Sequence, residues 1–98
     1  MAVVEVKVVP VGTGSASMSS YVASCYRVVE EEGLKHQLTP TSTIIEGDLA
    51  HVLNVARRMH QEAFAEGVER VVTNIYIDER RDKPTELADM VEAVMDEV

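Results

Sequence analysis

The segment at residues 12–20 holds the side chains best suited to bind a small polar ligand. It combines two glycines with four serines just before a predicted helix. Exposed N–H groups at a helix start attract anions and polar rings. The segment lacks the GxxxxGK[ST] spacing of a phosphate-binding loop, and its composition also suits an ordinary helix cap. Ligand binding and simple capping are therefore both open interpretations.

A second group with binding chemistry is the charged turn at residues 79–83, which contains three basic side chains. Guanidinium groups bind phosphate well, but the turn and its flank also carry carboxylates with which these side chains can pair at the surface. A phosphorylated metabolite held between this turn and the glycine-containing segment is one alternative ligand. The candidate anion-binding residues are Gly12, Thr13, Gly14, Arg80 and Arg81.

Catalytic and metal chemistry finds little support in the sequence. The histidines His36, His51 and His60 show no HxH or HxxxH spacing, and Cys25 is the only cysteine, which leaves no metal site or disulfide to assemble. Cys25 falls in the apolar stripe of a predicted helix and is interpreted as a packing residue. The glutamates at residues 30–32 are interpreted as a solvated charge run. The sequence predicts a protein that is not an enzyme and that needs no metal or cofactor.

Composition limits the classes of partner. The chain has 98 residues, 46% of them hydrophobic and 27% charged, which predicts one globular domain over residues 1–98. Its net charge of −8 repels phosphate backbones and argues against nucleic acid. No apolar run reaches the roughly 20 residues of a membrane span, and Glu5 and Lys7 interrupt the first apolar stretch, unlike in a signal peptide. We therefore expect a cytoplasmic protein that contacts neither nucleic acid nor membrane.

Hydrophobic periodicity predicts the elements that must position these residues. Residues 2–11 and 69–78 alternate as strands, and residues 34–39 and 41–46 form two shorter β-rich runs around Pro40. Helices are predicted from Ser17 or Ser19 to Glu32, from the cap Asp48 to a stop at Gly67, and from Pro84 onward. The order predicts an α+β fold: a ferredoxin-like β-α-β-β-α-β sandwich with a four-stranded antiparallel sheet and an appended C-terminal helix.

Two helices can cover only one face of such a sheet, so the other face is left open. Because strand residues alternate between faces, the open face is expected to carry Val3, Glu5, Lys7, Val9, Asn74 and Tyr76. This set is too apolar for a fully solvated surface and too polar for an ordinary core. A subunit interface that contains a ligand pocket would explain both properties. An interface without any ligand is the alternative, and the small size of the chain favours self-association.

Three stretches of the sequence resemble the small thiamine-binding, YkoF-like protein family. The first consists of VPVGTG at residues 9–14 and SMSSYVA at residues 17–23, the second is LTPTSTIIEG at residues 38–47, and the third is GVERVVTNIYIDERRD at residues 67–82. Together they span nearly the whole chain in the family's order. One departure is Thr41, at a position where the family often carries methionine, so the shape or polarity of a nearby pocket can differ here.

The resemblance implies a ferredoxin-like fold, a homotetramer built from sheet-mediated dimers, and binding of thiamine or its hydroxymethylpyrimidine moiety without catalysis. Thiamine joins an aminopyrimidine, which carries hydrogen-bond donors and acceptors, to a cationic thiazolium that prefers aromatic or acidic surroundings. We expect Glu5 and Asn74 to meet the pyrimidine edge and Tyr76 to stack, with hydroxyl groups at the rim. The hydroxyl candidates are Ser17, Ser19, Thr39 and Thr43.

Other roles stay open for these residues. Glu5 could instead pair with a basic residue across the sheet or across a subunit interface, and Tyr76 could pack in that interface. The alternative function is then a structural or regulatory homo-oligomer that has no small-molecule ligand.

Overall fold

Strands and helices follow one another along the chain as the hydrophobic periodicity predicts. The structure is a computed structural model, and it describes residues 1–12, 19–65, 67–83 and 86–98. Its elements are β1 (Ala2–Val11), α1 (Ser19–Glu32), β2 (Lys35–Leu38), β3 (Thr43–Gly47), α2 (Leu49–Phe64), β4 (Arg70–Glu79) and α3 (Leu87–Met95). The observed bounds differ from the predicted ones by no more than three residues.

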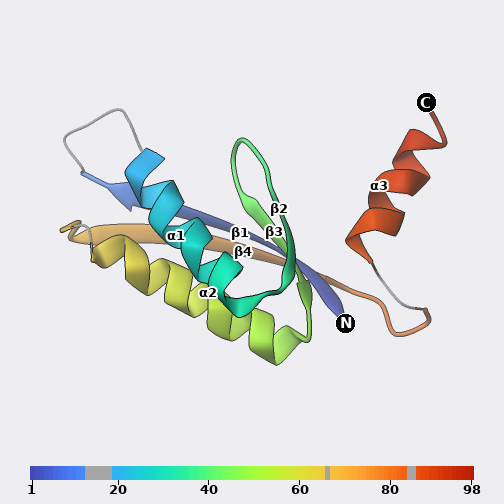
Figure 1. Cartoon of the computed structure of the whole chain (residues 1–98), viewed down its shortest axis with the longest axis horizontal. Coiled ribbons are helices and arrows are strands. Elements are labelled where there is room, and N and C mark those ends of the chain that lie inside the picture. The colour runs from blue at the N-terminus through green and yellow to red at the C-terminus, as the bar shows by residue number, and fades with distance from the viewer. Residues whose placement is uncertain (13–18, 66, 84–85) are drawn as a thin grey trace.

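The strands form one antiparallel sheet in the order β2-β3-β1-β4 (Figure 1). β1 is central: it pairs with β4 along its whole length but with β3 only from Ala2 to Val6. β2 pairs with the outer side of β3. Together with the β-α-β-β-α-β order, this arrangement is a ferredoxin-like α+β sandwich, so the predicted fold class is confirmed.

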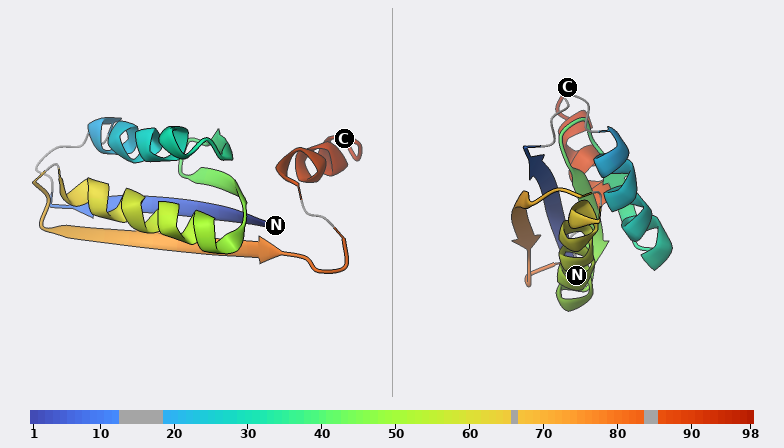
Figure 2. Two further views of the ribbon diagram at one scale, coloured as in Figure 1. Left: turned by 60° about the horizontal axis from the view of Figure 1, so that its bottom comes forward. Right: turned by 90° about the vertical axis from the view of Figure 1, so that its left-hand side faces the viewer.

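One face of the sheet is covered by α1 and α2 (Figure 2). The even-numbered residues of β1 face these helices because strand residues alternate, and Ala2, Val4 and Val6 are at most 1% exposed. Ile45 of β3 is fully buried beside them. The helices contribute residues at three- and four-residue spacing. The buried helical residues of this core are Cys25, Val28 and Val29 of α1 and Val52, Val55, Ala56, Met59 and Ala63 of α2.

The ends of the helices follow local sequence signals. Asp48 caps α2, because its Oδ2 accepts a hydrogen bond from the backbone N–H of His51 at 3.4 Å. Gly33 follows α1 with a φ of +66°, a left-handed conformation that glycine adopts most easily. α3 begins at Leu87 and not at Pro84 as predicted, because Glu86 still has an extended backbone (φ −125°, ψ 139°). Pro84 itself lies outside the described residues.

α3 stands apart from the layer of α1 and α2, beyond the end of the sheet (Figures 1 and 2). None of its residues is buried, and Val91, Val94 and Met95 are 48%, 64% and 62% exposed. The predicted apolar stripe of this helix therefore has little cover from the rest of the described chain. No described helix combines the length and the apolar character that a membrane span requires.

Candidate functional site

The uncovered face of the sheet brings the predicted open-face residues of β1 and β4 together. The strand register places Glu5 between Ile44 of β3 and Tyr76 of β4, and it places Lys7 opposite Asn74. Residues that are directly opposite in an antiparallel pair point to the same face. Asn74 therefore lies diagonally from Glu5 and not beside it.

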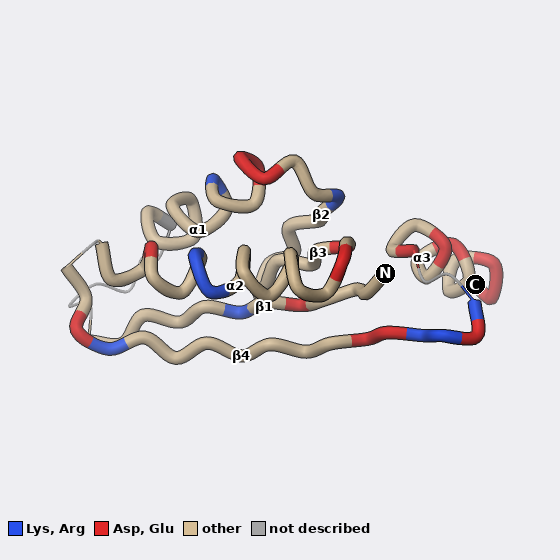
Figure 3. Tube along the Cα trace, turned by 90° about the horizontal axis from the view of Figure 1, so that it is seen from below, with Lys and Arg blue, Asp and Glu red and all other residues tan. Residues whose placement is uncertain are grey.

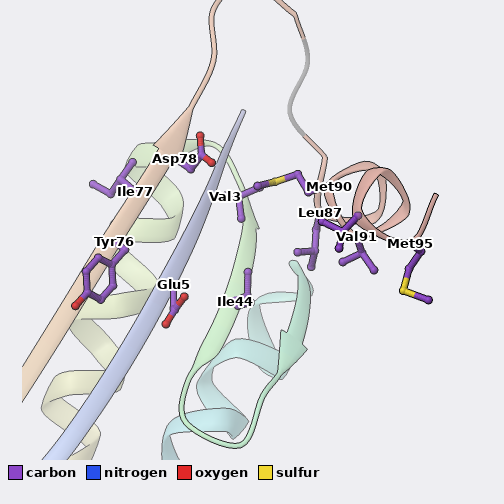
Figure 4. A pocket seen from close by; sticks show the side chains of 11 residues that line it. Val3, Glu5, Ile44, Tyr76, Ile77, Asp78, Leu87, Met90, Val91 and Met95 are labelled. Carbon is purple, nitrogen blue, oxygen red and sulfur yellow. The ribbon is translucent and has the colours of Figure 1, made fainter. Parts of the chain in front are cut away.

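A cavity of about 510 Å³ lies between this face and α3 (Figure 4), and we call it the open-face pocket. The sheet lines it with Val3, Glu5, Ile44, Tyr76, Ile77 and Asp78, and α3 lines it with Leu87, Met90, Val91, Val94 and Met95. Aliphatic and thioether groups make up most of the wall. Two carboxylates and one phenol are the polar side chains of the pocket.

Glu5 is partly buried in this pocket, and its carboxylate forms no hydrogen bond or ion pair with the residues that the structure describes. Tyr76, directly opposite, is 63% exposed. A carboxylate in apolar surroundings favours a positively charged partner, and a tyrosine ring attracts cations to its face. The pocket is therefore suited to a flat organic cation.

Most other charges near the pocket are also negative, although Lys7 of β1 and Lys35 of β2, the register partner of Glu46, lie on the same face of the sheet. Asp78 adds a second carboxylate to its wall. Glu46 of β3, opposite Val3, is only 4% exposed and has no ion-pair partner in the described part of the chain. Acidic residues also stand along α3, where Figure 3 shows no basic residue between Leu87 and the C-terminal end. These charges make the surroundings of the open-face pocket negative, which favours a cation and disfavours an anion.

A second cavity, of about 420 Å³, lies where β1 continues past β3, and we call it the strand-end pocket. Its lining residues are Val6, Lys7, Val8, Val9, Val22, Cys25, Leu38, Thr39, Pro40, Thr41, Ser42, Thr43 and Met59. Thr43 is 5% exposed, and its hydroxyl has no hydrogen-bond partner among the described residues. Thr43 pairs with the buried Val6 and so lies on the helix side of the sheet, away from Glu5.

Thr39 fixes the loop that joins β2 to β3. Its Oγ1 accepts a hydrogen bond from the backbone N–H of Ser42 at 3.0 Å and another from Thr41 at 3.3 Å. The Thr39 backbone N–H donates to the carbonyl oxygen of Ser42 at 2.9 Å. The Thr39 hydroxyl therefore holds one wall of the strand-end pocket in shape. Thr41, the position of the family departure, lies in the same wall.

The structure thus divides the predicted ligand-binding residues between two places. Glu5 and Tyr76 line the open-face pocket, whereas Thr39 and Thr43 line the strand-end pocket. Asn74 lines neither of these two cavities. Ser17 lies outside the described residues, and Ser19 is the first residue of α1.

Among the predicted anion-binding residues that the structure describes, Gly12 lies far from Arg80 and Arg81. In the antiparallel pair of β1 and β4, Ala2 is the register partner of Glu79, and Val11 is the register partner of Arg70. Gly12 and Arg80 therefore lie at opposite ends of a strand that is about 30 Å long. Thr13 and Gly14 lie outside the described residues. A phosphorylated metabolite therefore cannot bridge Gly12 and the turn that holds Arg80 and Arg81 within one chain. Within one subunit the alternative is therefore wrong for Gly12, and for Thr13 and Gly14 it stays a prediction.

Arg80 already has a partner. Its Nε donates a hydrogen bond to Oδ1 of Asp82 at 2.9 Å, and its Nη2 forms an ion pair with Oδ2 at 2.5 Å. This hydrogen bond raises the pKa of Arg80 and lowers the pKa of Asp82. The prediction that the basic turn pairs with its own carboxylates is confirmed for Arg80.

The histidines and the cysteine of the described chain have structural neighbours. His36 Nδ1 lies 2.6 Å from the carbonyl oxygen of Leu34, and its Nε2 lies 3.0 Å from the Tyr26 hydroxyl. His60 Nδ1 lies 2.6 Å from Thr73 Oγ1. Cys25 is buried, and its thiol donates to the carbonyl oxygen of Met59 at 3.4 Å, so its interpretation as a packing residue is confirmed. No group of three potential metal ligands occurs among the described residues.

Sequence reasoning missed the contribution of α3 to the open-face pocket. The apolar stripe of this helix was visible, but no sequence signal placed it opposite Glu5. It also missed the strand-end pocket as a separate cavity. The signal available was the difference in length between β1, with 10 residues, and β3, with 5, which leaves one edge of β1 uncovered.

The element order, the sheet order and the uncovered face define a ferredoxin-like α+β protein with two cavities beside its central strand. A family model described as "Thiamine-binding protein" matches residues 4–95. The chain therefore belongs to the thiamine-binding protein family. The resemblance seen in the three sequence stretches is confirmed.

Relatives match over almost their whole lengths. UPF0045 protein YqgV of Bacillus subtilis strain 168 is 43% identical over 98 residues, which cover 96% of this chain and 94% of the relative. The UPF0045 protein in the glkA 3′ region of Staphylococcus xylosus is 44% identical, over 96% of this chain and 92% of the relative.

Solved structures share the fold. Hypothetical protein MJ1052 from Methanocaldococcus jannaschii has a TM-score of 0.89 at 33% identity, over 96% of this chain and 95% of that one. A Thermotoga maritima protein proposed to act in thiamine biosynthesis or salvage has a TM-score of 0.80 at 18% identity, over 95% and 97% of the two chains. At that identity the likeness supports the fold alone.

Proposed function

We propose that the protein binds thiamine, or the hydroxymethylpyrimidine part of thiamine, in the open-face pocket without catalysing a reaction. Membership of the thiamine-binding family supports a binding role. The observation that carries the assignment to this pocket is the carboxylate of Glu5, which is partly buried, lacks a partner among the described residues and lies opposite Tyr76. A cationic ring would supply the missing partner.

The thiazolium ring of thiamine matches this surface in charge and shape. It is flat and permanently positive, so Glu5 and Asp78 attract it and the ring of Tyr76 can lie against it. The thioethers of Met90 and Met95 add polarizable groups that adapt to an aromatic guest. The sequence suggested that Glu5 and Asn74 meet the pyrimidine edge, but Asn74 does not line this pocket, so we place the thiazolium beside Glu5 and Tyr76 instead. The cavity of about 510 Å³ is within the usual range of roughly 300–1,000 Å³ for small-molecule sites.

The composition of the pocket wall supports a role without catalysis. Its ionisable side chains are Glu5, Tyr76 and Asp78. None of the three forms a hydrogen bond to another residue in the wall, whereas nucleophilic catalysis requires a nucleophile held beside a base. The cytoplasmic location stays a prediction from the sequence.

The chain is also proposed to assemble with copies of itself as a homotetramer built from dimers that meet at the open face. Its accessible surface is 6358 Å², whereas a compact monomer of this mass exposes roughly 5,500 Å². The difference is close to the roughly 800 Å² that one partner buries in a standard protein interface. The exposed apolar residues that such an interface would cover include Val72 on β4 and Val94 on α3.

Isothermal titration calorimetry with thiamine and with hydroxymethylpyrimidine tests the proposed function. The wild-type protein is expected to bind thiamine. Glu5→Gln keeps the shape of the side chain and removes its charge, so it is expected to weaken thiamine binding by roughly 10-fold or more, as loss of a charged hydrogen-bonding partner does. Neutral hydroxymethylpyrimidine is expected to lose less affinity.

The matched control is Glu62→Gln, the same substitution on an exposed position of α2. It is expected to leave thiamine binding unchanged. Equal affinities of the wild-type and Glu5→Gln proteins would contradict the proposed site. No heat with either compound, together with an intact oligomer in sedimentation, would instead support the ligand-free structural oligomer.

A further inference from the structure

A third cavity, of about 620 Å³, lies between the β2–β3 side of the sheet and α3, and we call it the edge pocket. Lys35 of β2 and Glu46 of β3 line it from the sheet, and Glu86 and Glu92 line it from the other side. The register pairs Lys35 with Glu46, and Glu46 with Val3 of the open face. The edge pocket therefore lies on the same face as the open-face pocket, but nearer to β2.

Glu46 is the buried acidic group of this cavity. It is only 4% exposed, and its carboxylate forms no hydrogen bond or ion pair with any residue that the structure describes. Its register partner Lys35 has an exposed side chain that forms no ion pair within the same part of the chain. A carboxylate buried away from water is costly unless a positive group or several hydrogen bonds compensate it. Glu46 is therefore suited to a cation that enters the edge pocket from outside.

The mouth of the edge pocket is also acidic. Glu86 directly precedes α3 and Glu92 lies in its second turn, and both side chains are exposed. His36 also lines the cavity, but its two ring nitrogens already contact the Leu34 carbonyl oxygen and the Tyr26 hydroxyl. The wall thus carries three carboxylates and one lysine, which gives it a net charge of −2 when His36 is neutral.

The shape of the wall favours a guest with separated charges. The carboxylates do not converge on one point, because no group of three potential metal ligands occurs among the described residues. A single metal ion would therefore lack most of its coordination shell here. Leu87, Val91 and Met95 of α3 give the same cavity an apolar side. The surface suits positive groups at separate positions that are joined by an apolar chain.

We propose that the edge pocket binds a linear aliphatic diamine or polyamine. One ammonium group donates hydrogen bonds to Glu46 at the floor, and a second pairs with Glu86 or Glu92 at the mouth. The methylene chain between them contacts Val91 and Met95, as the alkyl stems of charged side chains contact apolar surfaces. This ligand class differs from the aromatic cation proposed for the open-face pocket, and the site does not depend on it.

Calorimetry of the full chain at low ionic strength tests the proposal with 1,4-diaminobutane as the probe. Two analogues separate the charges from the chain, because 1-aminobutane lacks the second ammonium group and 1,4-butanediol lacks both. The diamine is expected to bind. The affinity of 1-aminobutane is expected to be lower by roughly 10-fold or more, since one charged hydrogen-bonding partner is missing. 1,4-Butanediol is expected to give no binding heat.

Methyl NMR of the methionines locates the bound probe. Met95 lines the edge pocket, whereas Met90 lines the open-face pocket but not the edge pocket, and Met59 lines the strand-end pocket. In Figure 4, Met90 extends toward Val3 and Met95 points away from it. The diamine is expected to shift the methyl signal of Met95 most and to leave the signal of Met59 in place.

Glu46→Gln keeps the shape of the buried side chain and removes its charge, so it is expected to weaken diamine binding by roughly 10-fold or more. Asp89→Asn is the matched control, because Asp89 lies on α3 without lining the edge pocket and the change in net charge is the same. It is expected to weaken binding by about 2-fold or less, since salt screens exposed charges. Glu5→Gln is expected to have an equally small effect, which separates this site from the open-face pocket.

A variant at an exposed position keeps the test decisive if Glu46→Gln fails to fold. Lys35→Gln removes the positive charge beside Glu46, with which the diamine has to compete. It is therefore expected to tighten diamine binding by about 3-fold, in the range of an exposed ion pair. Unchanged or weaker binding in this variant would contradict the position of the ammonium group.

Four further results would overturn the proposal. One is that millimolar diamine leaves the Met95 signal of the wild-type protein unshifted. Another is that 1-aminobutane binds as tightly as the diamine, and a third is that the wild-type and Glu46→Gln proteins bind the diamine equally well. The fourth is a Met95 shift that follows protein concentration without any probe, which would mean that a lysine of a second copy fills the pocket.

Discussion

His51 Nε2 lies 2.9 Å from Glu32 Oε2, and this contact joins the C-terminal end of α1 to the first turns of α2. Arg58, further along α2, forms ion pairs with the carboxylates of both Glu31 and Glu32. The glutamate run at residues 30–32, interpreted from sequence as solvated charge, therefore also connects the two helices. The hydrogen bond from His51, with the neighbouring charge of Arg58, holds the pKa of Glu32 below its ordinary value of 4.5.

This contact predicts a defined pH dependence of stability. In the unfolded chain Glu32 takes up a proton near pH 4.5, but in the folded chain it does so only at lower pH. The lowered pKa therefore favours the folded state above pH 4.5, and this contribution is lost as the pH falls from 4.5 through the folded-state value. Glu32→Gln should have a lower urea midpoint than the wild-type protein at pH 6, and the difference should shrink at pH 3.

Glu30→Gln is the control for this pH experiment. Glu30 is an exposed neighbour on α1 for which the described structure has no ion pair. Its substitution should leave the pH profile close to that of the wild-type protein. A Glu32→Gln profile that runs parallel to the wild-type profile from pH 6 to pH 3 would contradict the role given to the contact.

The core predicts a contrast between two isoleucines on the helix side of the sheet. Ile45 of β3 is fully buried, whereas Ile75 of β4 is 42% exposed. Ile45→Ala should lower the free energy of unfolding by about 2–5 kcal/mol, because it removes buried methyl groups and leaves a cavity. Ile75→Ala should cost about 1 kcal/mol or less, because its side chain is only partly packed. Urea denaturation measures both values, and equal losses would place the core elsewhere.

The open face predicts an effect of charge on assembly. Val72 lies on this face opposite Val9 and is 41% exposed, and it does not line the open-face pocket. Val72→Glu should dissociate the oligomer, because an unpaired charge in an apolar interface is costly. Leu53→Glu, on the exposed side of α2, should leave the assembly intact. Sedimentation velocity distinguishes the species, and dissociation by Leu53→Glu alone would move the interface to the helix layer.

The negative surroundings of the open-face pocket predict its preference among thiamine derivatives. Thiamine diphosphate should bind more weakly than thiamine, because Glu5, Asp78 and the net charge of −8 repel its phosphates. Arg80→Ala should not change this order, since Arg80 is paired with Asp82. Calorimetry with both compounds checks the prediction. Tighter binding of the diphosphate that disappears in Arg80→Ala would contradict it.

The alternation of β1 made much of this fold predictable from sequence. Because side chains alternate strictly along a strand, the assignment of Val4 to the core and Glu5 to the open face follows once the strand is recognised. Helix ends with a specific chemical signal, such as Asp48 and Gly33, are also where the sequence placed them. Local rules of this kind depend on residues that are close in the chain.

The division of the site into two pockets was not predictable in the same way. Thr43 was expected at the rim of the open face, but its pairing with Val6 turns it toward the helices. That pairing depends on the register between β1 and β3, which the length of the intervening chain does not fix. The pocket likewise brings Glu5 and α3 together although they are more than 80 positions apart in the chain, a relationship that no local sequence rule predicts.

The one-sided cover of the sheet has a consequence for how this family can diversify. Even-numbered residues of β1 maintain the core, while their odd-numbered neighbours face outward. A substitution at Glu5 or Lys7 can therefore change which guest is recognised without disturbing Val4 or Val6. Descendants of one ancestral chain could acquire new specificities along this strand by single steps while their architecture stays the same.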